Sequence, residues 1–216
     1  GVNFGIYYQL IQRKWSVAWR DAELRLYAGI VVTATALITL SLILQDTPGD
    51  AEASYKNHSF GKVVLDALFQ VVSVQTTTGF ATGDFDAWAF PAKAILLVLM
   101  FVGASAGSTG GGIKVIRVLI TGKVIRDELE HAYRPNVVRT TTIGKATVHP
   151  ELKLNTLVFI LIMALIFAAG TSALMMTEGS EAIDITTAAT ACIATLNNIG
   201  PGLAAVGATE TYNWFS

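Results

Sequence analysis

Charge is what this chain has least of. Only 14% of its 216 residues are Asp, Glu, Lys or Arg, whereas 52% are hydrophobic and the mean hydropathy is +0.52. An ordinary soluble domain carries roughly a quarter charged residues. The formal net charge of -1 also gives no overall excess of Lys and Arg, which argues against a nucleic-acid partner. The composition therefore indicates a membrane protein.

Reactive side chains are equally sparse. The single cysteine, Cys192, excludes an intrachain disulfide framework and lies in an apolar segment. The three histidines stand far apart in the sequence, without the spacing of metal ligands. We see no cluster of acid, base and nucleophile, so an enzyme is not expected, and neither is a resident cofactor.

Two long runs lack charge altogether. Residues 26–44 and 154–176 contain no Asp, Glu, Lys or Arg. Each run approaches the roughly 20 apolar residues that cross about 30 Å of hydrocarbon as a helix. Both are therefore expected to span a lipid bilayer.

The flanking charges orient these spans. One side would hold Arg13, Lys14, Arg20, Arg25, Lys114, Arg117, Lys123, Arg126, Arg134, Arg139, Lys145 and Lys153; the other would hold Lys56, Lys62 and Lys93. The positive-inside bias assigns the first side to the cytoplasm. The outer side would be acidic, with Asp46, Asp50, Glu52, Asp84, Asp86, Glu178, Glu181 and Asp184. These carboxylates either concentrate cations there or are simply solvated loop residues.

Two shorter apolar segments, residues 63–74 and 185–196, are too brief to span. Segments of roughly 10 to 14 apolar residues are more often re-entrant or core helices. Each is followed by a glycine-containing polar stretch, residues 75–80 and 197–202 respectively. Non-helical backbone at membrane depth is tolerated only when it is buried in protein or lines a water-filled cavity. The order of a span, a short helix and a polar stretch thus occurs twice.

These polar stretches have the chemistry of an ion-selectivity filter. Backbone carbonyls can replace the hydration shell of a monovalent cation without placing a full charge in the pore. The expected ligands are the carbonyls of Thr77, Thr78, Gly79 and Phe80 and of Asn198, Ile199, Gly200 and Pro201. We call these sets the first and second carbonyl segments. Gly79 and Gly200 are the strongest candidates, because pointing successive carbonyls inward needs backbone angles that a Cβ disfavours.

A glycine-rich run, residues 103–112, separates two further apolar stretches. Each Gly costs roughly 1 kcal/mol relative to Ala inside a helix, so the run should break the helix. It is not a phosphate loop, because Ile113 stands where that motif needs Lys. We expect this glycine loop to be a movable gate, formed by Gly103, Gly107, Ser108, Gly110, Gly111 and Gly112. Passive close packing of small residues is the alternative.

Lys114 and Arg117 follow the glycine loop and, three residues apart, share a helix face. They either act at the gate or on a partner, or serve as cytoplasmic anchors.

Three motifs together resemble a known family: Gln75-Thr76-Thr77-Thr78-Gly79-Phe80, Gly110-Gly111-Gly112-Ile113-Lys114, and Asn197-Asn198-Ile199-Gly200-Pro201-Gly202. They are similar to the third and fourth repeats of the Trk, Ktr and HKT superfamily of potassium uptake proteins, and most of all to the membrane subunits of bacterial Trk systems. The resemblance implies an all-α membrane protein with four membrane helix–pore helix–filter–membrane helix units around a pseudo-fourfold pore like that of a potassium channel.

The resemblance also implies a division of the chain. Residues 1–25 would end the preceding repeat and form a cytoplasmic linker, 26–132 would be the third repeat, 133–153 a cytoplasmic connection, and 154–216 a fourth repeat cut before its last helix. We therefore expect a piece of a longer protein.

The function implied is potassium uptake across a bacterial inner membrane, with K⁺ as the transported ion and a gate in the glycine loop. A homodimer and a cytoplasmic nucleotide-binding regulatory subunit of the TrkA type are the implied partners. A secondary transporter of another cation or small solute, which also uses broken helices, is the alternative.

Overall fold

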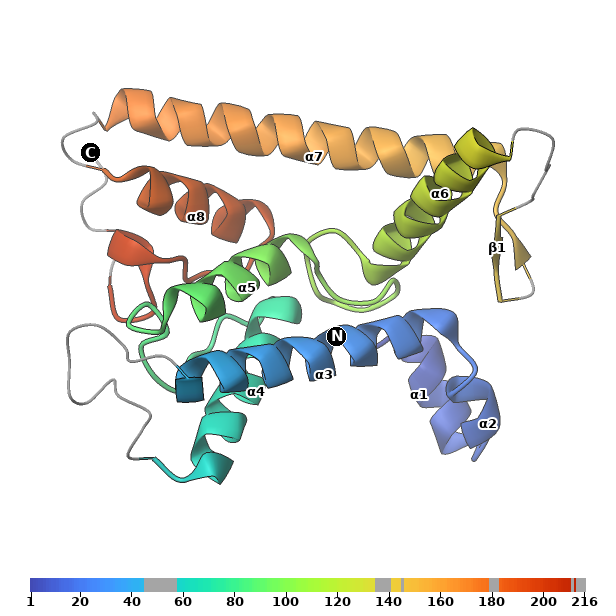
Figure 1. Ribbon diagram of the computed structural model, residues 1–216, viewed down its shortest axis with the longest axis horizontal. Coiled ribbons are helices and arrows are strands. Elements are labelled where there is room, and N and C mark those ends of the chain that lie inside the picture. Colours follow the sequence, from blue (N-terminus) through green and yellow to red (C-terminus); the bar gives the residue numbers. More distant parts are fainter. Residues whose placement is uncertain (45–57, 135–140, 145, 179–182, 211, 213–216) are drawn as a thin grey trace.

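The computed structural model describes residues 1–44, 58–134, 141–144, 146–178, 183–210 and 212. Its two longest helices are α3 (Ala22–Leu44, 23 residues) and α7 (Pro150–Thr177, 28 residues), and both are long and apolar enough to cross a membrane. Helices α5, α6 and α8 lie between them, whereas α1, α2 and the start of α4 lie on the other side of α3 (Figure 1). The expected spans at residues 26–44 and 154–176 are thus confirmed as membrane-length helices.

The two short helices are α4 (Phe60–Gln75) and α8 (Ile185–Leu196). Both end near the middle of the molecule (Figure 1). The bounds of α8 coincide with the expected ones, whereas α4 is 16 residues long because it begins three residues earlier than expected, directly after Ser59 at the N-cap position, and ends one residue later. The apolar core lies where α3, α4, α5 and α8 meet, and it includes Ile38, Leu42, Val63, Val71, Leu96, Met100 and Ile193.

The next membrane segment is broken, as the glycine content predicts. Helix α5 (Phe90–Phe101) and helix α6 (Val115–Tyr133) are separated by the glycine loop. A parallel bridge between Val102 and Ile113 closes the base of the loop. Its hydrogen bonds run from Gly103 N to Ile113 O, 3.0 Å, and from Ile113 N to Phe101 O, 3.1 Å. The two ends of the glycine loop are therefore held together by hydrogen bonds, so the loop does not hold α5 and α6 apart as an extended linker would.

The smaller elements lie toward the two ends of the molecule. Helices α1 (Phe4–Ile11) and α2 (Trp15–Ala18) precede α3, and Arg13 between them has a φ of 58°. Strands β1 (Thr142–Ile143) and β2 (Ala146–Thr147) form an antiparallel hairpin, which the sequence did not predict. A 3₁₀ turn, η2 (Ala204–Val206), packs against α8 near the other end.

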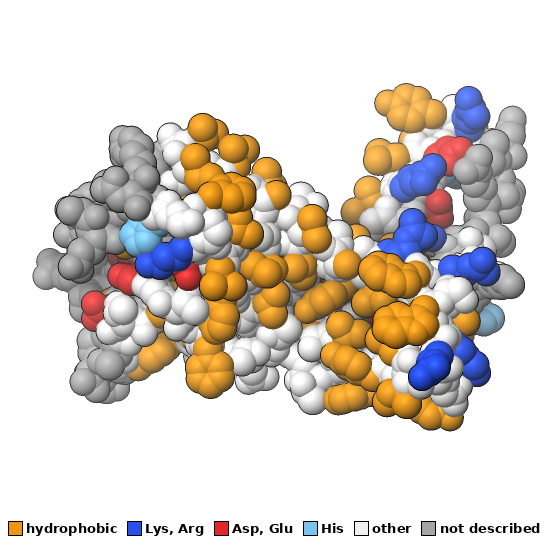
Figure 2. Space-filling view, turned by 90° about the horizontal axis from the view of Figure 1, so that it is seen from below, with side chains coloured by type: hydrophobic (Ala, Val, Ile, Leu, Met, Phe, Trp, Pro, Cys, Tyr) orange, Lys and Arg blue, Asp and Glu red, His pale blue; other side chains and the backbone are white. Residues whose placement is uncertain are grey.

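The charges are divided along the long axis. Figure 2 shows most of the Lys and Arg side chains at the end that carries α1, α2 and α6, together with some acidic ones, whereas acidic side chains outnumber basic ones at the opposite end. This agrees with the orientation expected from the sequence. Asp46, Asp50, Glu52, Lys56, Arg139, Lys145 and Glu181 lie outside the described residues. Between the two ends, α7 exposes leucine and isoleucine side chains such as Leu161 and Leu165, as a helix facing lipid would.

This orientation is testable by labelling. In the full-length protein with Cys192→Ser, a cysteine replacing the exposed Lys62 should react with a membrane-impermeant maleimide in intact cells. A cysteine replacing the exposed Lys14 should react only after permeabilisation, because the basic end faces the cytoplasm. Cys192→Ser alone is the unlabelled control, and the reverse pattern would contradict the orientation.

Candidate functional site

The two carbonyl segments have the same backbone geometry. Thr77 and Asn198 have φ angles of 55° and 57°, and Gly79 and Gly200 have φ angles of 78° and 107°. Left-handed backbone at alternate positions turns successive carbonyls toward one side of the chain. Such angles are rare for a non-glycine residue, and for β-branched Thr77 they are outliers.

Matching hydrogen bonds precede both segments. At the end of α4, Thr76 N, Thr77 N and Thr78 N donate to the carbonyls of Val72, Val74 and Ser73, at 2.9, 3.1 and 2.9 Å. At the end of α8, Asn197 N, Asn198 N and Ile199 N donate to Ile193, Thr195 and Ala194, at 3.0, 3.2 and 2.8 Å. All three bonds occupy equivalent positions when Gly79 is aligned with Gly200. The internal repeat therefore extends to individual backbone bonds.

The two segments also lie against each other. A Cβ added at Gly79 would overlap the carbonyl oxygen of Ile199 and would lie 3.3 Å from Cδ of Pro201. At Gly200, by contrast, no described atom lies within 4 Å of an added Cβ. Glycine is thus needed at position 79 because of both the close contact and the positive φ, whereas at position 200 it is needed because of the positive φ alone.

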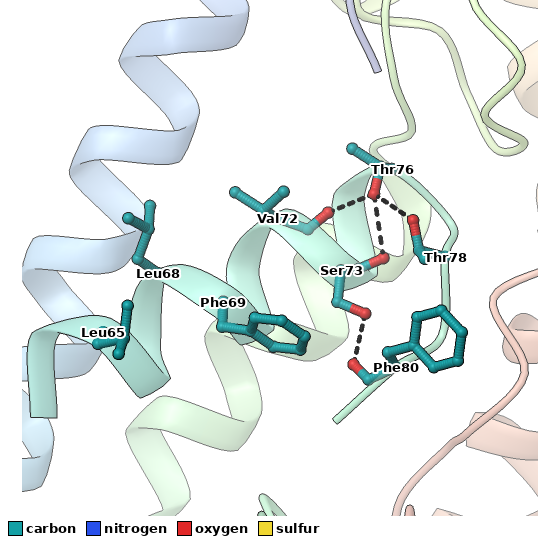
Figure 3. Close-up of a pocket in the computed structure, with 8 residues that line it drawn as sticks. All are labelled: Leu65, Leu68, Phe69, Val72, Ser73, Thr76, Thr78 and Phe80. Carbon is teal, nitrogen blue, oxygen red and sulfur yellow. Dashed lines mark hydrogen bonds between the residues drawn. The ribbon is translucent and has the colours of Figure 1, made fainter. Parts of the chain in front are cut away.

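Side chains of α4 support the first segment (Figure 3). Ser73 Oγ donates to the Phe80 carbonyl at 2.5 Å, and Thr76 Oγ1 donates to the Val72 carbonyl at 2.6 Å. Thr76 Oγ1 also lies 2.7 Å from Thr78 Oγ1. These residues line a hollow of about 360 Å³, together with Leu65, Leu68 and Phe69 on the same face of α4. The Phe80 carbonyl, already bonded to Ser73, is less free to bind an ion than its neighbours.

In the second segment the Gly200 carbonyl has a similar partner. Tyr212 Oη donates to it at 2.9 Å. Burial raises the pKa of the Tyr212 phenol, so it stays a neutral donor at physiological pH.

The glycine loop packs directly onto the inner ends of both segments. A Cβ at Gly111 would overlap the Asn197 carbonyl oxygen, and one at Gly110 would lie 3.3 Å from the Thr76 carbonyl oxygen. Gly111 N donates to Thr77 Oγ1 at 2.8 Å. Because Thr76 and Asn197 hold equivalent places after the two short helices, the loop covers the same point of both repeats.

Other expected gate residues lie elsewhere in the loop. A Cβ at Gly103 would overlap the Gly111 carbonyl, and Gly112 has a φ of 67° beside it. Gly107 and Ser108 lie away from the carbonyl segments: Gly107 O accepts from Phe4 N at 3.2 Å, and Ser108 Oγ donates to Ser105 O at 2.6 Å.

Lys114 and Arg117 have different surroundings despite their spacing. The Lys114 ammonium donates to the Gly110 carbonyl within the loop. The Arg117 guanidinium lies 3.7 Å from the centre of the Phe159 ring on α7. Lys114 is therefore in contact with the loop, whereas Arg117 ties α6 to α7 through a cation–π contact.

Two buried polar residues at this site were not singled out by the sequence. Asn197 Nδ2 donates to the Met100 carbonyl at 2.9 Å and so joins the end of α8 to α5. Glu23 Oε1 accepts from Ala106 N in the loop at 2.6 Å. Only the place of Asn197 in the motif at residues 197–202 could have pointed to it. Glu23 looked like an ordinary acidic residue in the first turn of a helix.

The described residues contain no group of three or more His, Cys, Asp or Glu side chains that could hold a metal ion.

The chain is similar to known proteins along most of its length. A family model described as "Cation transport protein", TrkH, matches residues 3–213. The Trk system potassium uptake protein TrkH of Escherichia coli K12 is 34% identical over 207 residues, which cover 95% of this chain and 40% of that protein. The Trk system potassium uptake protein TrkI of Halomonas elongata is 25% identical over 200 residues, covering 93% and 38%.

A solved structure is similar as well. The crystal structure of the potassium transporter TrkH from Vibrio parahaemolyticus superposes with a TM-score of 0.80 at 32% identity, over 94% of this chain and 42% of that one. The chain thus spans about 40% of the length of the curated relatives it matches.

Proposed function

The chain belongs to the TrkH family of cation transport proteins, and on that premise we propose that it forms part of a pore through which a bacterial cell takes up potassium. It is a helical membrane protein of a transporter family, not an enzyme. The proposal assigns K⁺ selection to the two carbonyl segments and control of flow to the glycine loop.

One observation carries this proposal: two short helices end in segments with the same hydrogen bonds and left-handed positions. Carbonyls arranged in this way supply the oxygen ligands that a dehydrated monovalent cation needs. The two helices also direct their partially negative C-terminal ends at the segments, which favours a cation over an anion. The ligands proposed are the carbonyls of residues 77–80 and 198–201.

The repeat gives the proposed division of the chain. Helices α3 and α4, the first carbonyl segment, and α5 with α6 follow one another as one unit, for which we propose residues 26–132, although α3 begins at Ala22 and α6 ends at Tyr133. Helices α7 and α8 and the second carbonyl segment begin the next unit, for which we propose residues 154–216, although α7 begins at Pro150. Residues 1–25 would belong to a preceding unit and residues 133–153 to a cytoplasmic connection.

Gating is assigned to the glycine loop because it lies against the inner end of both segments. Lys114 supports this role through its bond to Gly110, and Arg117 acts as an anchor on Phe159. A homodimer in the bacterial inner membrane and a nucleotide-binding cytoplasmic subunit of the TrkA type complete the proposal. Their basis is the resemblance of the three motifs to the Trk, Ktr and HKT superfamily.

Potassium-dependent growth tests the function. The full-length protein, expressed in a bacterium that lacks its own potassium uptake, should restore growth at low potassium and take up ⁸⁶Rb⁺. Sodium or an organic solute at the same concentration should not compete with ⁸⁶Rb⁺, because the ligands proposed are carbonyls that select by field strength and number. Membrane-inserted protein that takes up no ⁸⁶Rb⁺ would refute the proposal, and competition by a solute would favour a secondary transporter.

A further inference from the structure

Glu23 is the buried carboxylate for which the proposed function has no use. Its exposed fraction is 8%, although it lies at the basic, cytoplasmic end of α3 where water would be within reach. Burying a carboxylate is costly unless hydrogen bonds compensate it. The bond from Ala106 N to Glu23 Oε1, 2.6 Å long, supplies such compensation and joins residues far apart in the chain.

The partner of Glu23 belongs to a distinct part of the glycine loop. Gly110 and Gly111 contact the carbonyl segments, whereas residues 105–107 face the other way. Ser105 N donates to Gly1 O at 2.9 Å, and Phe4 N donates to Gly107 O at 3.2 Å. We call residues 105–107 the anchor end of the loop.

Glu23 differs from the other partners of the anchor end because it binds through a side chain. A backbone hydrogen bond such as that of Ser105 breaks only when one of the two backbone segments moves. A side-chain hydrogen bond can break by rotation of the side chain alone, while both backbone segments keep their conformation. The Lys114 side chain, which directly follows the loop, also holds Gly110. The loop is thus held by an acidic side chain from α3 at Ala106 and by a basic side chain from its own C-terminal flank at Gly110.

We propose that Glu23 is the positioning residue that keeps the glycine loop seated on the two carbonyl segments. Its carboxylate oxygen fixes Ala106, and the fixed anchor end holds Gly110 and Gly111 against the segments. Loss of that bond lets the loop leave the pore without altering the carbonyls themselves. The proposal rests on the proposed function, in which the seated loop obstructs ion flow.

Two conservative variants of the full-length protein separate contact from charge. Glu23→Asp keeps the charge but withdraws the carboxylate by one methylene, so the bond to Ala106 is lost. Glu23→Gln keeps an oxygen at the same reach and loses the charge. In proteoliposomes, resting ⁸⁶Rb⁺ flux should rise roughly tenfold in Glu23→Asp, the factor expected for one lost charge-assisted hydrogen bond. Flux in Glu23→Gln should rise less, by about threefold, because a neutral hydrogen bond is roughly half as strong as a charge-assisted one.

Asp21 supplies the matched control. It carries the same charge two residues earlier, and its Oδ1 caps α3 by accepting from Leu24 N at 2.8 Å. Asp21→Asn should leave resting flux unchanged. A rise in Asp21→Asn equal to that in Glu23→Asp would show that disturbance of the start of α3 is responsible rather than the bond to Ala106, and would overturn the proposal.

A third readout distinguishes positioning from general support of the fold. In a Gly111→Ala background, where the loop is already displaced, adding Glu23→Asp should raise flux no further, because both changes act through the same element. The ratio of K⁺ to Na⁺ flux should be unchanged throughout. Equal resting flux in Glu23→Asp and unmodified protein, or a leak in Glu23→Gln as large as in Glu23→Asp, overturns the proposal. Absence of flux from the unmodified protein and from every loop variant, Gly111→Ala included, refutes the proposed function itself.

Discussion

Replacing Gly79 with alanine in the full-length protein is expected to abolish potassium-dependent growth. Alanine at this position would have to keep a backbone φ near 78°, and its Cβ would overlap the carbonyl oxygen of Ile199. A left-handed conformation costs an L-residue roughly 1–2 kcal/mol, and the overlap forces the two carbonyl segments apart in addition. We expect the rate of ⁸⁶Rb⁺ uptake to fall by at least about a hundredfold, which corresponds to roughly 2.7 kcal/mol.

Two other glycines set the scale for this result. Gly200→Ala adds the backbone strain at φ 107° with no described atom within 4 Å of the new Cβ, so a smaller fall, about tenfold, is expected. Gly83→Ala, four residues after Gly79, meets open space in the described part of the chain and should behave like the unmodified protein. Normal uptake by Gly79→Ala at equal membrane abundance, or equal damage from Gly83→Ala, would contradict the assignment.

Gly111→Ala should have the opposite effect and increase ion flux. Its Cβ would overlap the Asn197 carbonyl oxygen, so the glycine loop would have to withdraw from the second segment. The bond from Gly111 N to Thr77 Oγ1 would then be lost. We expect resting ⁸⁶Rb⁺ flux through the full-length protein to rise by about tenfold or more, because a loop that no longer seats cannot obstruct the pore.

A smaller change at the same contact should act in the same direction. Thr77→Val removes the acceptor of that bond while keeping a β-branched side chain at the left-handed position, so resting flux should rise by severalfold. Gly122→Ala in α6 is the control: no neighbour among the described residues comes within 4 Å of its added Cβ, and Ala favours helix. Unchanged or lower flux in Gly111→Ala would contradict the gate and would favour the alternative that the loop only packs small residues closely.

Much of the fold could be predicted because it depends on long, simple patterns. The runs without charge at residues 26–44 and 154–176 became α3 and α7, and the glycine content at residues 103–112 marked the break between α5 and α6. The alignment of Gly79 with Gly200 also followed from the order of elements. Such patterns extend over many residues, so the secondary structure that they predict does not depend on any single tertiary contact.

The contacts between distant residues could not be predicted. Lys114 and Arg117 look alike in sequence, and only packing against α7 separates the one that binds the loop from the one that stacks on Phe159. The left-handed Thr77 has no local signal, because β-branched residues normally avoid such angles. The bond between Glu23 and Ala106 joins residues that the chain order sets far apart. Such details depend on tertiary structure that holds strained or buried groups in place.

Locating bound ions would test the central claim most directly. In crystals of the full-length protein grown with Rb⁺ in place of K⁺, anomalous scattering should reveal ions between the carbonyls of residues 77–80 and 198–201. Their distances to those oxygens should be those of a dehydrated ion. Rb⁺ bound only at side-chain carboxylates of the outer end, with none between the two carbonyl segments, would contradict the claim that these segments select the ion.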